Sequence, residues 1–386
     1  MSTKRVLTSK LPVESQAALI RVVSLLKARG LKLSIRDLFE HQSIAELSSH
    51  VQADETAVKQ LAPFELLTEA ERERLDQEDQ DYVDAYPLSA LQAGMVFHTQ
   101  LEQFSGIYHD IMAQHVKCRW DQPRFEQALS TCIDEHPILR SSFSLQGERP
   151  LQRVHARRAL PLWIEDLRAL NNEEQEQQLA QWMESRKRHV FDWERGPLFA
   201  IHIFRRTDES FQFIVSFHHA VLDGWSRAVL TTDLYNRYER LLADQPLDAV
   251  AVNWTYRDFI AQEQAVLADP AARAHFQTML EEAPSMQLPR LVIPPLPEGA
   301  PTQGQWVLEP FTALSGRLIE LARHLGVPVQ SVLLAVHFKV LSVLSGQSAA
   351  LSCVTHNGRP ESARRRQEDR RTGSITVAAS ATPRGQ

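Results

Sequence analysis

The sequence predicts a mixed α and β domain, because strand-like runs and long helical stretches alternate through the middle of the chain. Two apolar runs, Phe199–Phe204 and Phe211–Phe217, have the β-branched and aromatic content typical of buried strands. They lie between two stretches with helical periodicity, Asn172–Lys187 and Arg227–Leu242. This mixture favours an α/β or α+β domain over a helical bundle or a β-sandwich.

The composition is that of a globular protein with room for two or three domains. Of its 386 residues 43% are apolar, and the net charge of -6 argues against a protein-wide nucleic-acid-binding surface. The three cysteines, Cys118, Cys132 and Cys353, form no CxxC pair, which argues against a disulfide scaffold or a cysteine-rich metal site. With no apolar signal region and no run of membrane-spanning length, we expect a soluble, cytoplasmic protein.

The first 52 residues are predicted to form three small helices. The first has helical spacing of apolar residues from Leu19 to Leu26, and Gly30 would end it. Ser34 and Ser43 each start a Ser-x-x-acid pattern that opens the next two helices. Helices of this size bury little surface, so this part is not expected to be stable by itself.

Two segments have the composition of exposed chain. Residues 53–84 are rich in Glu, Asp, Gln and Arg, and we expect a solvated linker with one amphipathic helix around Glu65–Leu75. Residues 362–386 begin with an arginine cluster and contain no aromatic residue and no leucine. Such a segment cannot offset its own ordering entropy, so it is expected to be a disordered, solvated tail.

Residues 211–230, FQFIVSFHHAVLDGWSRAVL, are the most informative stretch. Alternation along a strand places His219 with Phe217 on the apolar side and His218 on the opposite side. The polar segment Arg205–Ser210 is a predicted turn that joins this strand to the preceding one in an antiparallel hairpin.

A helix is predicted directly after the histidines. Asp223 and Gly224 interrupt the extended chain, and Gly224 permits a tight turn or a close approach to a ligand. Ser226 is expected to cap the helix. The buried face of that helix is expected to consist of Leu230, Leu234, Tyr238 and Leu241.

His219 is the candidate catalytic residue, because it follows a rigid strand at the start of a loop. Burial lowers the pKa of a histidine, so we expect a neutral imidazole that accepts a proton. His218 points the other way and the chain has no HExxH pattern, so acid/base chemistry is favoured over a metal site. The alternative is that both histidines are structural, but the complete string HHxxxDG after an apolar strand favours catalysis.

The string HHAVLDGWS resembles the HHxxxDG signature of nonribosomal peptide synthetase condensation domains, a branch of the chloramphenicol-acetyltransferase-like fold. Further motifs of that family are matched in order. They are YPLSALQAGMVFH (86–98), DEHPILRSSF (134–143), FDWERGPLFAIHIF (191–204), NWTYRDFI (253–260) and VTHNGRPE (354–361). Residues 21–47 similarly resemble the C-terminal half of a peptidyl carrier protein.

The resemblance implies a domain order. Residues 1–52 would be partial carrier helices, 85–255 the N-terminal lobe of a two-lobe condensation domain, and 256–361 the start of its C-terminal lobe. The resemblance stops after Glu361, so the second lobe is expected to be incomplete, as in a truncated or frame-shifted gene.

The resemblance also implies an activity: formation of an amide bond between a donor acyl or peptidyl thioester and an acceptor aminoacyl thioester. The partners would be donor and acceptor carrier domains that present phosphopantetheine arms; no covalently bound cofactor, metal, nucleic acid or membrane is expected. His219 would be the central catalytic residue, whether as base or by positioning the amine, within a motif that includes His218, Asp223 and Gly224. Structural support is expected from three residues, Arg140 (paired with Asp223), Trp225 and Ser226.

Some positions depart from the family pattern. In the second motif Glu135 stands where an arginine is usual, and Pro137 where an acid is common. The carrier-like segment lacks the Gly-Gly-Asp-Ser turn that carries phosphopantetheine. Gln16 occupies the attachment position, and Ser15, one residue away, is a poor substitute.

Two alternatives remain open. The chain could be a catalytically inactive remnant that docks carriers, because the segments expected to floor the substrate tunnel are missing. It could also be a coenzyme A-dependent acyltransferase, since that class shares HHxxxDG, although the carrier-like helices and the opening motif argue against it.

Overall fold

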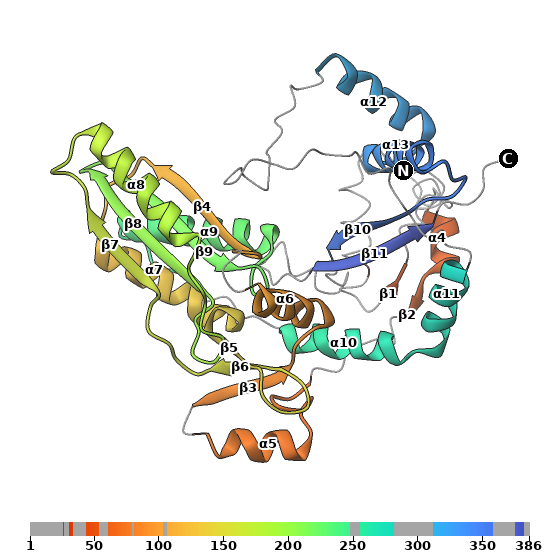
Figure 1. Ribbon diagram of the computed structural model, residues 1–386, viewed down its shortest axis with the longest axis horizontal. Coiled ribbons are helices and arrows are strands. Elements are labelled where there is room, and N and C mark those ends of the chain that lie inside the picture. Colours follow the sequence, from red (N-terminus) through yellow and green to blue (C-terminus); the bar gives the residue numbers. More distant parts are fainter. Residues whose placement is uncertain are drawn as a thin grey trace, which may run out of the picture. The chain divides into compact units, whose positions relative to one another are not determined.

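The computed structural model describes Leu26 and residues 31–33, 44–53, 61–78, 81–102, 106–247, 255–281, 312–357 and 375–381. Figure 1 labels the helices and strands of the chain, which divides into two compact units. The first comprises Met1–Ala265 and Asn357–Ile375, and the second comprises Val266–His356 and Thr376–Gln386.

A four-stranded sheet organises the first unit. Its order is β4 (His109–Val116), β9 (Ser210–His218), β8 (Phe199–Thr207) and β7 (Leu162–Asp166). Strands β8 and β9 are antiparallel, which confirms the predicted hairpin. The turn is shorter than predicted, because Thr207 and Ser210 already pair across the two strands.

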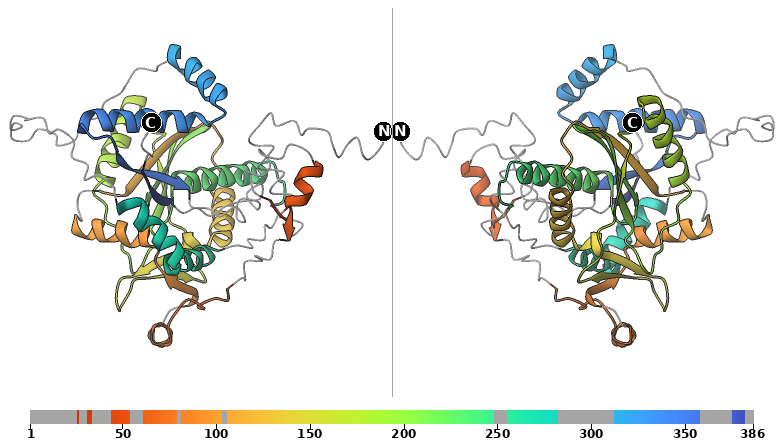
Figure 2. Two further views of the ribbon diagram at one scale, coloured as in Figure 1. Left: turned by 90° about the vertical axis from the view of Figure 1, so that its right-hand side faces the viewer. Right: turned by 90° about the vertical axis from the view of Figure 1, so that its left-hand side faces the viewer.

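Helices pack on both faces of this sheet (Figures 1 and 2). On one face lie α7 (Gln122–Glu135) and α9 (Gly224–Leu242), on the other α8 (Asn172–Arg186). The larger core joins alternate residues of β9 to α7 and α9: Phe211, Phe213, Val215, Phe125, Leu129, Leu230, Leu234 and Tyr238. The smaller core contains Leu167, Leu179, Phe204 and Ile214. The residues of β9 alternate between the two cores because side chains alternate along a strand. Leu230, Leu234 and Tyr238 are buried and Leu241 packs against them, which confirms the predicted buried face of the helix after the histidines.

A second sheet, of three strands, lies in the same unit. Its order is β3 (Tyr82–Pro87), β6 (Leu151–His155) and β5 (Ser141–Ser144), all antiparallel. The 3₁₀ turn η1 (Pro137–Arg140) leads into β5. Two further helices belong to this region, α6 (Ala90–Leu101) and α10 (Tyr256–Ala268), and the first residues of α10 pack against Tyr86 and Val154.

The segment expected to be a linker, 53–84, differs from that expectation over its described residues. Helix α5 (Glu69–Asp76) begins four residues after Glu65, because Thr68 and Glu71 form a capping box. Glu71 also pairs with Arg149 at 2.8 Å, and this hydrogen bond is the main cause that lowers the pKa of Glu71 to about 2. Leu75 of α5 packs against Ala85 and Leu151 of the three-stranded sheet, so this described part of the segment is held to the fold.

Of the predicted N-terminal helices, the structure describes one, α4 (Ile44–His50), which begins after Ser43 as expected. It also describes a strand pair that was not predicted, β1 (Leu31–Lys32) with β2 (Gln52–Ala53). Ser15, Gln16, Gly30 and Ser34 lie outside the described residues.

The second unit contains three helices and a strand pair among its described residues. They are α11 (Pro270–Glu281), α12 (Thr312–Leu325), α13 (Val329–Ser345), β10 (Leu351–Asn357) and β11 (Ile375–Ala381). Strand β11, which pairs with β10, lies within the segment that was expected to be a disordered tail. Across the described ranges no single helix is long and apolar enough to cross a membrane, and α12 with α13 meets that test only as a pair bent by 104°.

Gly196 gives a prediction for stability. Its φ is +52°, and a Cβ at this position would lie 2.9 Å from the carbonyl oxygen of Ser141, which is part of the backbone. We expect Gly196→Ala to lower the free energy of unfolding by about 1–3 kcal/mol. The matched control is Gly94→Ala inside α6, where a Cβ meets nothing within 4 Å. Urea denaturation of both variants measures the difference, and equal midpoints would contradict the expectation.

Candidate active site

His219 is held at the end of β9 by its backbone. The strand ends at His218, and the N–H of His219 donates to the carbonyl oxygen of Tyr108 at 2.8 Å. Tyr108 has a φ of +59°, a conformation that is rare for a tyrosine. Such residues collect at functional sites when the surrounding structure holds them in place. The loop before β4 and the end of β9 therefore fix where the His219 side chain begins.

The imidazole of His219 is oriented by Asp110 on β4. Its Nδ1 lies 2.7 Å from Oδ2 of Asp110, and 26% of the His219 side chain and 50% of that of Asp110 are exposed. The hydrogen bond to Asp110 is the main cause that raises the pKa of His219, against the opposing effect of burial. The expectation that burial leaves His219 with a lowered pKa is therefore wrong.

A carboxylate on Nδ1 has a chemical consequence. Because Asp110 accepts the proton of Nδ1–H, the lone pair of the neutral ring is on Nε2. The same carboxylate stabilises the imidazolium that forms when Nε2 takes up a proton. The arrangement can accept a proton from a ligand and return it.

His218 has the lowered pKa that was expected of its neighbour. Its side chain points away from that of His219 and the residue is 1% exposed. Burial is the main cause that lowers its pKa to about 3. Nδ1 accepts from the N–H of Ala220 at 3.1 Å, so Nε2 carries the proton and donates to the hydroxyl of Thr99 at 2.9 Å. His218 is thus a neutral residue that fixes the backbone next to His219, and the two rings share no metal site.

Asp223, and not Ser226, caps the helix that follows the histidines. Asp223 is the N-cap of α9, and its Oδ1 accepts from the N–H of Ser226 at 2.6 Å. The expectation that Ser226 caps this helix is wrong, because the chain turns helical already at Gly224. The charge of Asp223 contributes to the raised pKa of His219.

Arg140 does not form the expected ion pair with Asp223. Its guanidinium donates to backbone carbonyls, among them those of His155 at 2.6 Å and Ile133 at 3.2 Å. These bonds tie η1 to the end of β6 and to α7. Arg140 therefore supports the fold of the first unit through backbone carbonyls, and not through the side chain of Asp223 as the resemblance to the family implied.

The remaining residues of the motif are open to the surface. Gly224 and Trp225 lie in the first turn of α9, and Trp225 is 55% exposed. A Cβ on Gly224 would meet nothing within 4 Å, and the residue has no left-handed φ. A tight turn and a close approach of ligand both stay predictions for Gly224.

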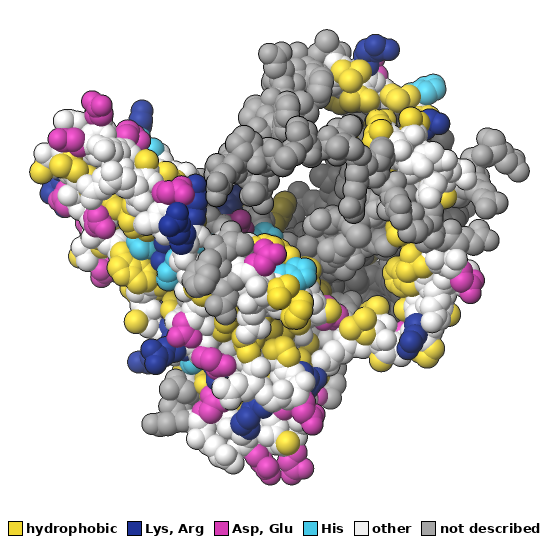
Figure 3. All heavy atoms as spheres, in the orientation of Figure 1, with side chains coloured by type: hydrophobic (Ala, Val, Ile, Leu, Met, Phe, Trp, Pro, Cys, Tyr) yellow, Lys and Arg dark blue, Asp and Glu magenta, His cyan; other side chains and the backbone are white. Residues whose placement is uncertain are grey.

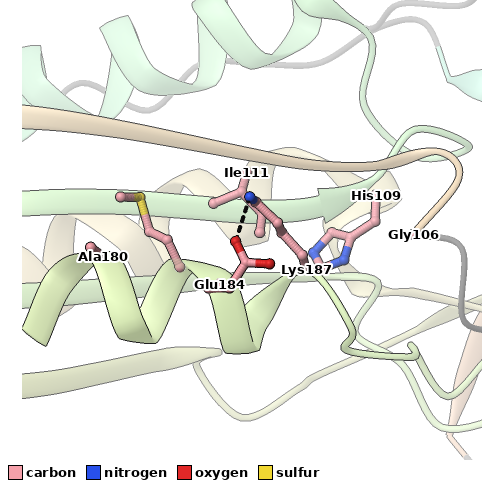
Figure 4. Close-up of a pocket in the computed structure, with 7 residues that line it drawn as sticks. Gly106, His109, Ile111, Ala180, Glu184 and Lys187 are labelled. Atoms are coloured by element: carbon pink, nitrogen blue, oxygen red, sulfur yellow. Dashed lines mark hydrogen bonds and ion pairs between the residues drawn. The ribbon is translucent and has the colours of Figure 1, made fainter. Parts of the chain in front are cut away.

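A separate cavity of about 590 Å³ lies on the opposite face of β4 (Figure 4). His109 and Ile111 from β4 line it opposite Ala180 and Glu184 from α8. Since side chains alternate along a strand, Asp110 and His219 point away from this cavity. It is not part of the candidate active site.

No group of three or more His, Cys, Asp or Glu side chains that could hold a metal ion is found among the described residues. The chemistry that the site offers is that of one imidazole and its carboxylate. Asp110, Tyr108 and Thr99 were not singled out from the sequence. The available signal for Asp110 was an acidic residue directly before the apolar run Ile111–Ala113.

The pH dependence of the site follows from the two shifted groups. The hydrogen bond to His219 is the main cause that lowers the pKa of Asp110, and the pKa of His219 is raised. Stability from Asp110 is present above its unfolded-state pKa and lost as the pH falls through its folded-state pKa. Stability from His219 is present below its unfolded-state pKa and lost as the pH rises through its folded-state pKa.

We expect Asp110→Asn to return the pKa of His219 towards its ordinary value. The fraction of neutral His219 at a given pH then increases, so the acidic limb of any activity profile moves to lower pH. NMR titration of the His219 ring in both proteins is the measurement, with the exposed His115 of β4 as internal control. An unchanged His219 titration would show that Asp110 does not control this ring.

Sequence comparison identifies relatives among peptide synthetases. The profile described as "Condensation domain" matches residues 82–375, which reaches beyond Glu361. AMB antimetabolite synthetase AmbE of Pseudomonas aeruginosa is 33% identical over 358 residues, which are 89% of this chain and 16% of that protein. Gramicidin S synthase 2 of Brevibacillus brevis is 30% identical over 208 residues, covering 54% of this chain and 5% of the relative. The chain thus spans only a small part of these curated relatives.

Solved structures share the fold. The four-domain nonribosomal peptide synthetase holo-AB3403, bound to AMP and glycine, has a TM-score of 0.60 at 21% identity, covering 81% of this chain and 23% of that one. The first condensation domain of the calcium-dependent antibiotic synthetase has a TM-score of 0.58 at 19% identity, covering 78% and 70%. The mixed α and β fold expected from the sequence is confirmed, and the chain belongs to the condensation domain family of nonribosomal peptide synthetases.

Proposed function

We propose that this chain acts in amide-bond formation, with His219 as the catalytic residue. The observation that carries the proposal is the His219–Asp110 pair, which presents Nε2 as the free proton acceptor at the end of β9. Membership in the condensation domain family indicates the class of reaction, and the hydrogen bond to Asp110 makes His219 able to act as its acid/base residue.

The reaction uses His219 twice. The amine nitrogen of the acceptor attacks the thioester carbonyl carbon of the donor, and Nε2 takes the proton that the nitrogen loses. The carbon–sulfur bond then breaks, and the imidazolium returns the proton to the departing thiolate. Asp110 stabilises the charged intermediate state of the ring. The positive N-terminus of α9, close to His219 in the chain, favours negative charge developing on the carbonyl oxygen.

The partners in this proposal are a donor and an acceptor carrier domain, each presenting its substrate on a phosphopantetheine arm. The alignment with AmbE covers 358 residues, so the similarity to this synthetase extends beyond the profile match over 82–375. Ser15 is a weak candidate for an attachment site, since the glycines that precede the carrier serine are missing. The proposed domain needs no metal and no cofactor of its own.

The test is an intact-mass assay with separately loaded donor and acceptor carriers. Transfer of the donor group to the acceptor carrier, with the mass of the amide product, supports the proposal. Transfer only from a coenzyme A thioester to a free amine would support a free acyltransferase instead. Carrier binding without transfer would support a docking remnant, and would overturn the catalytic role of His219.

A further inference from the structure

Arg227, in the first turn of α9, carries a charge that no described carboxylate neutralises. Its guanidinium donates to the thioether sulfur of Met112 on β4, which is a weak acceptor. The residue is partly exposed, and none of its nitrogens belongs to the described buried atoms that lack a partner, so its other N–H groups are not fully enclosed by the described residues. An arginine held in this way keeps several donors available for a ligand.

Arg227 and His219 reach the same face of β4. His219 binds Asp110, and Arg227 binds Met112, two residues further along the strand. Alternate residues of a strand share a face and are separated by roughly 6–7 Å. A ligand whose reacting group is at His219 can therefore reach Arg227 with a short side chain.

The charges around this position are mixed: two carboxylates, Asp110 and Asp223, act on His219, and the guanidinium of Arg227 is the group that would bind an anion. Asp110 is paired with His219, and Asp223 accepts a hydrogen bond at the N-terminus of α9. The helix N-terminus adds positive partial charge next to Arg227. Arginine binds a carboxylate through two parallel hydrogen bonds, which distinguishes a carboxylate from an amide of the same shape.

We propose that Arg227 binds a side-chain carboxylate of one of the two aminoacyl substrates, so that this site prefers an acidic residue such as aspartate or glutamate. This inference rests on the proposed condensation function. The phosphate of a carrier arm is at the opposite end of that arm from the thioester. It is therefore too far away to be the anion while the thioester is at His219.

The test is binding of aspartyl and asparaginyl N-acetylcysteamine thioesters to the full chain, measured by saturation-transfer NMR and calorimetry. We expect the aspartyl probe to bind about tenfold more tightly than the asparaginyl probe, because only the aspartyl carboxylate can form a charge-assisted hydrogen-bonded pair with Arg227. Arg227→Met is expected to remove this preference and Arg227→Lys to restore part of it. The control is Arg195→Met, which removes the same charge at a side chain that is 88% exposed and should keep the preference.

Equal binding of the two probes to the wild-type chain, or a preference that survives in Arg227→Met, would overturn the inference. Thermal melting of each variant confirms that the comparison is made on folded protein. Amide formation with neutral substrates is measured separately. If transfer occurs without any acid preference, the inference about Arg227 fails and the condensation function stands.

Discussion

Replacing His219 with alanine is expected to lower the rate of amide formation by about 10²–10⁴-fold, the usual contribution of a positioned acid/base residue. The loss follows from removing the proton acceptor while Asp110, the backbone bond to Tyr108 and the core of β9 remain. The side chains of His219 and Asp110 are 26% and 50% exposed, so the stability of the fold should fall only by the small contribution of this pair. The measurement is the initial rate of transfer between loaded carriers, followed by intact mass.

Two further variants make this result specific. His115→Ala removes an exposed histidine from β4, outside the site, and should leave the rate unchanged. His218→Ala removes a buried ring that bonds to Thr99 and Ala220, so it should reduce stability together with activity. A His219→Ala protein with the wild-type rate would exclude His219 as a catalytic residue, and the role of the motif would then be structural.

The local structure around the histidines could be predicted from the sequence because it depends on neighbours in the chain. The two-residue repeat of Phe211–Phe217 and the polar turn before it define the hairpin, and both are local signals. The same repeat placed His218 and His219 on opposite faces, as the structure has them. The expected direction of the pKa shift of His219 was wrong, because the hydrogen bond to Asp110 outweighs the effect of burial.

That partner was beyond the reach of sequence patterns. Asp110 lies 109 residues before His219 in the chain, and the pairing of β4 with β9 brings them together. No local periodicity encodes which strand occupies the edge of a sheet. The Arg140–Asp223 pair was wrong for the related reason that a guanidinium also finds partners among free backbone carbonyls, here at the end of β6.

The departure from the family pattern at Glu135 has a structural counterpart on α9. Glu135, at the end of α7, forms an ion pair with Arg237, and their side chains are 12% and 3% exposed. Two further nitrogens of Arg237, Nε and Nη1, are buried without a hydrogen-bond partner. The pair thus connects the second motif to the helix that carries Asp223 and Arg227.

We expect Glu135→Gln to lower the free energy of unfolding by about 3–5 kcal/mol, because it leaves the buried charge of Arg237 without its carboxylate. The control is Glu184→Gln, which breaks the exposed pair with Lys187 and should cost about 0–1 kcal/mol. Urea denaturation of both variants gives the comparison. A loss at Glu135 no larger than at Glu184 would show that the pair is solvated in solution.

The double variant Glu135→Leu with Arg237→Met separates a stranded charge from a loss of packing. Replacing both members of a buried pair with apolar residues of similar volume is often neutral or stabilising, so the double variant should be more stable than Glu135→Gln. If it is equally unstable, packing between α7 and α9 is the cause, and the charge is not. If it is stable and still forms the amide, the ion pair is dispensable for the placement of α9. The carboxylate of Glu135 would then be needed for stability only because it neutralises the buried charge of Arg237.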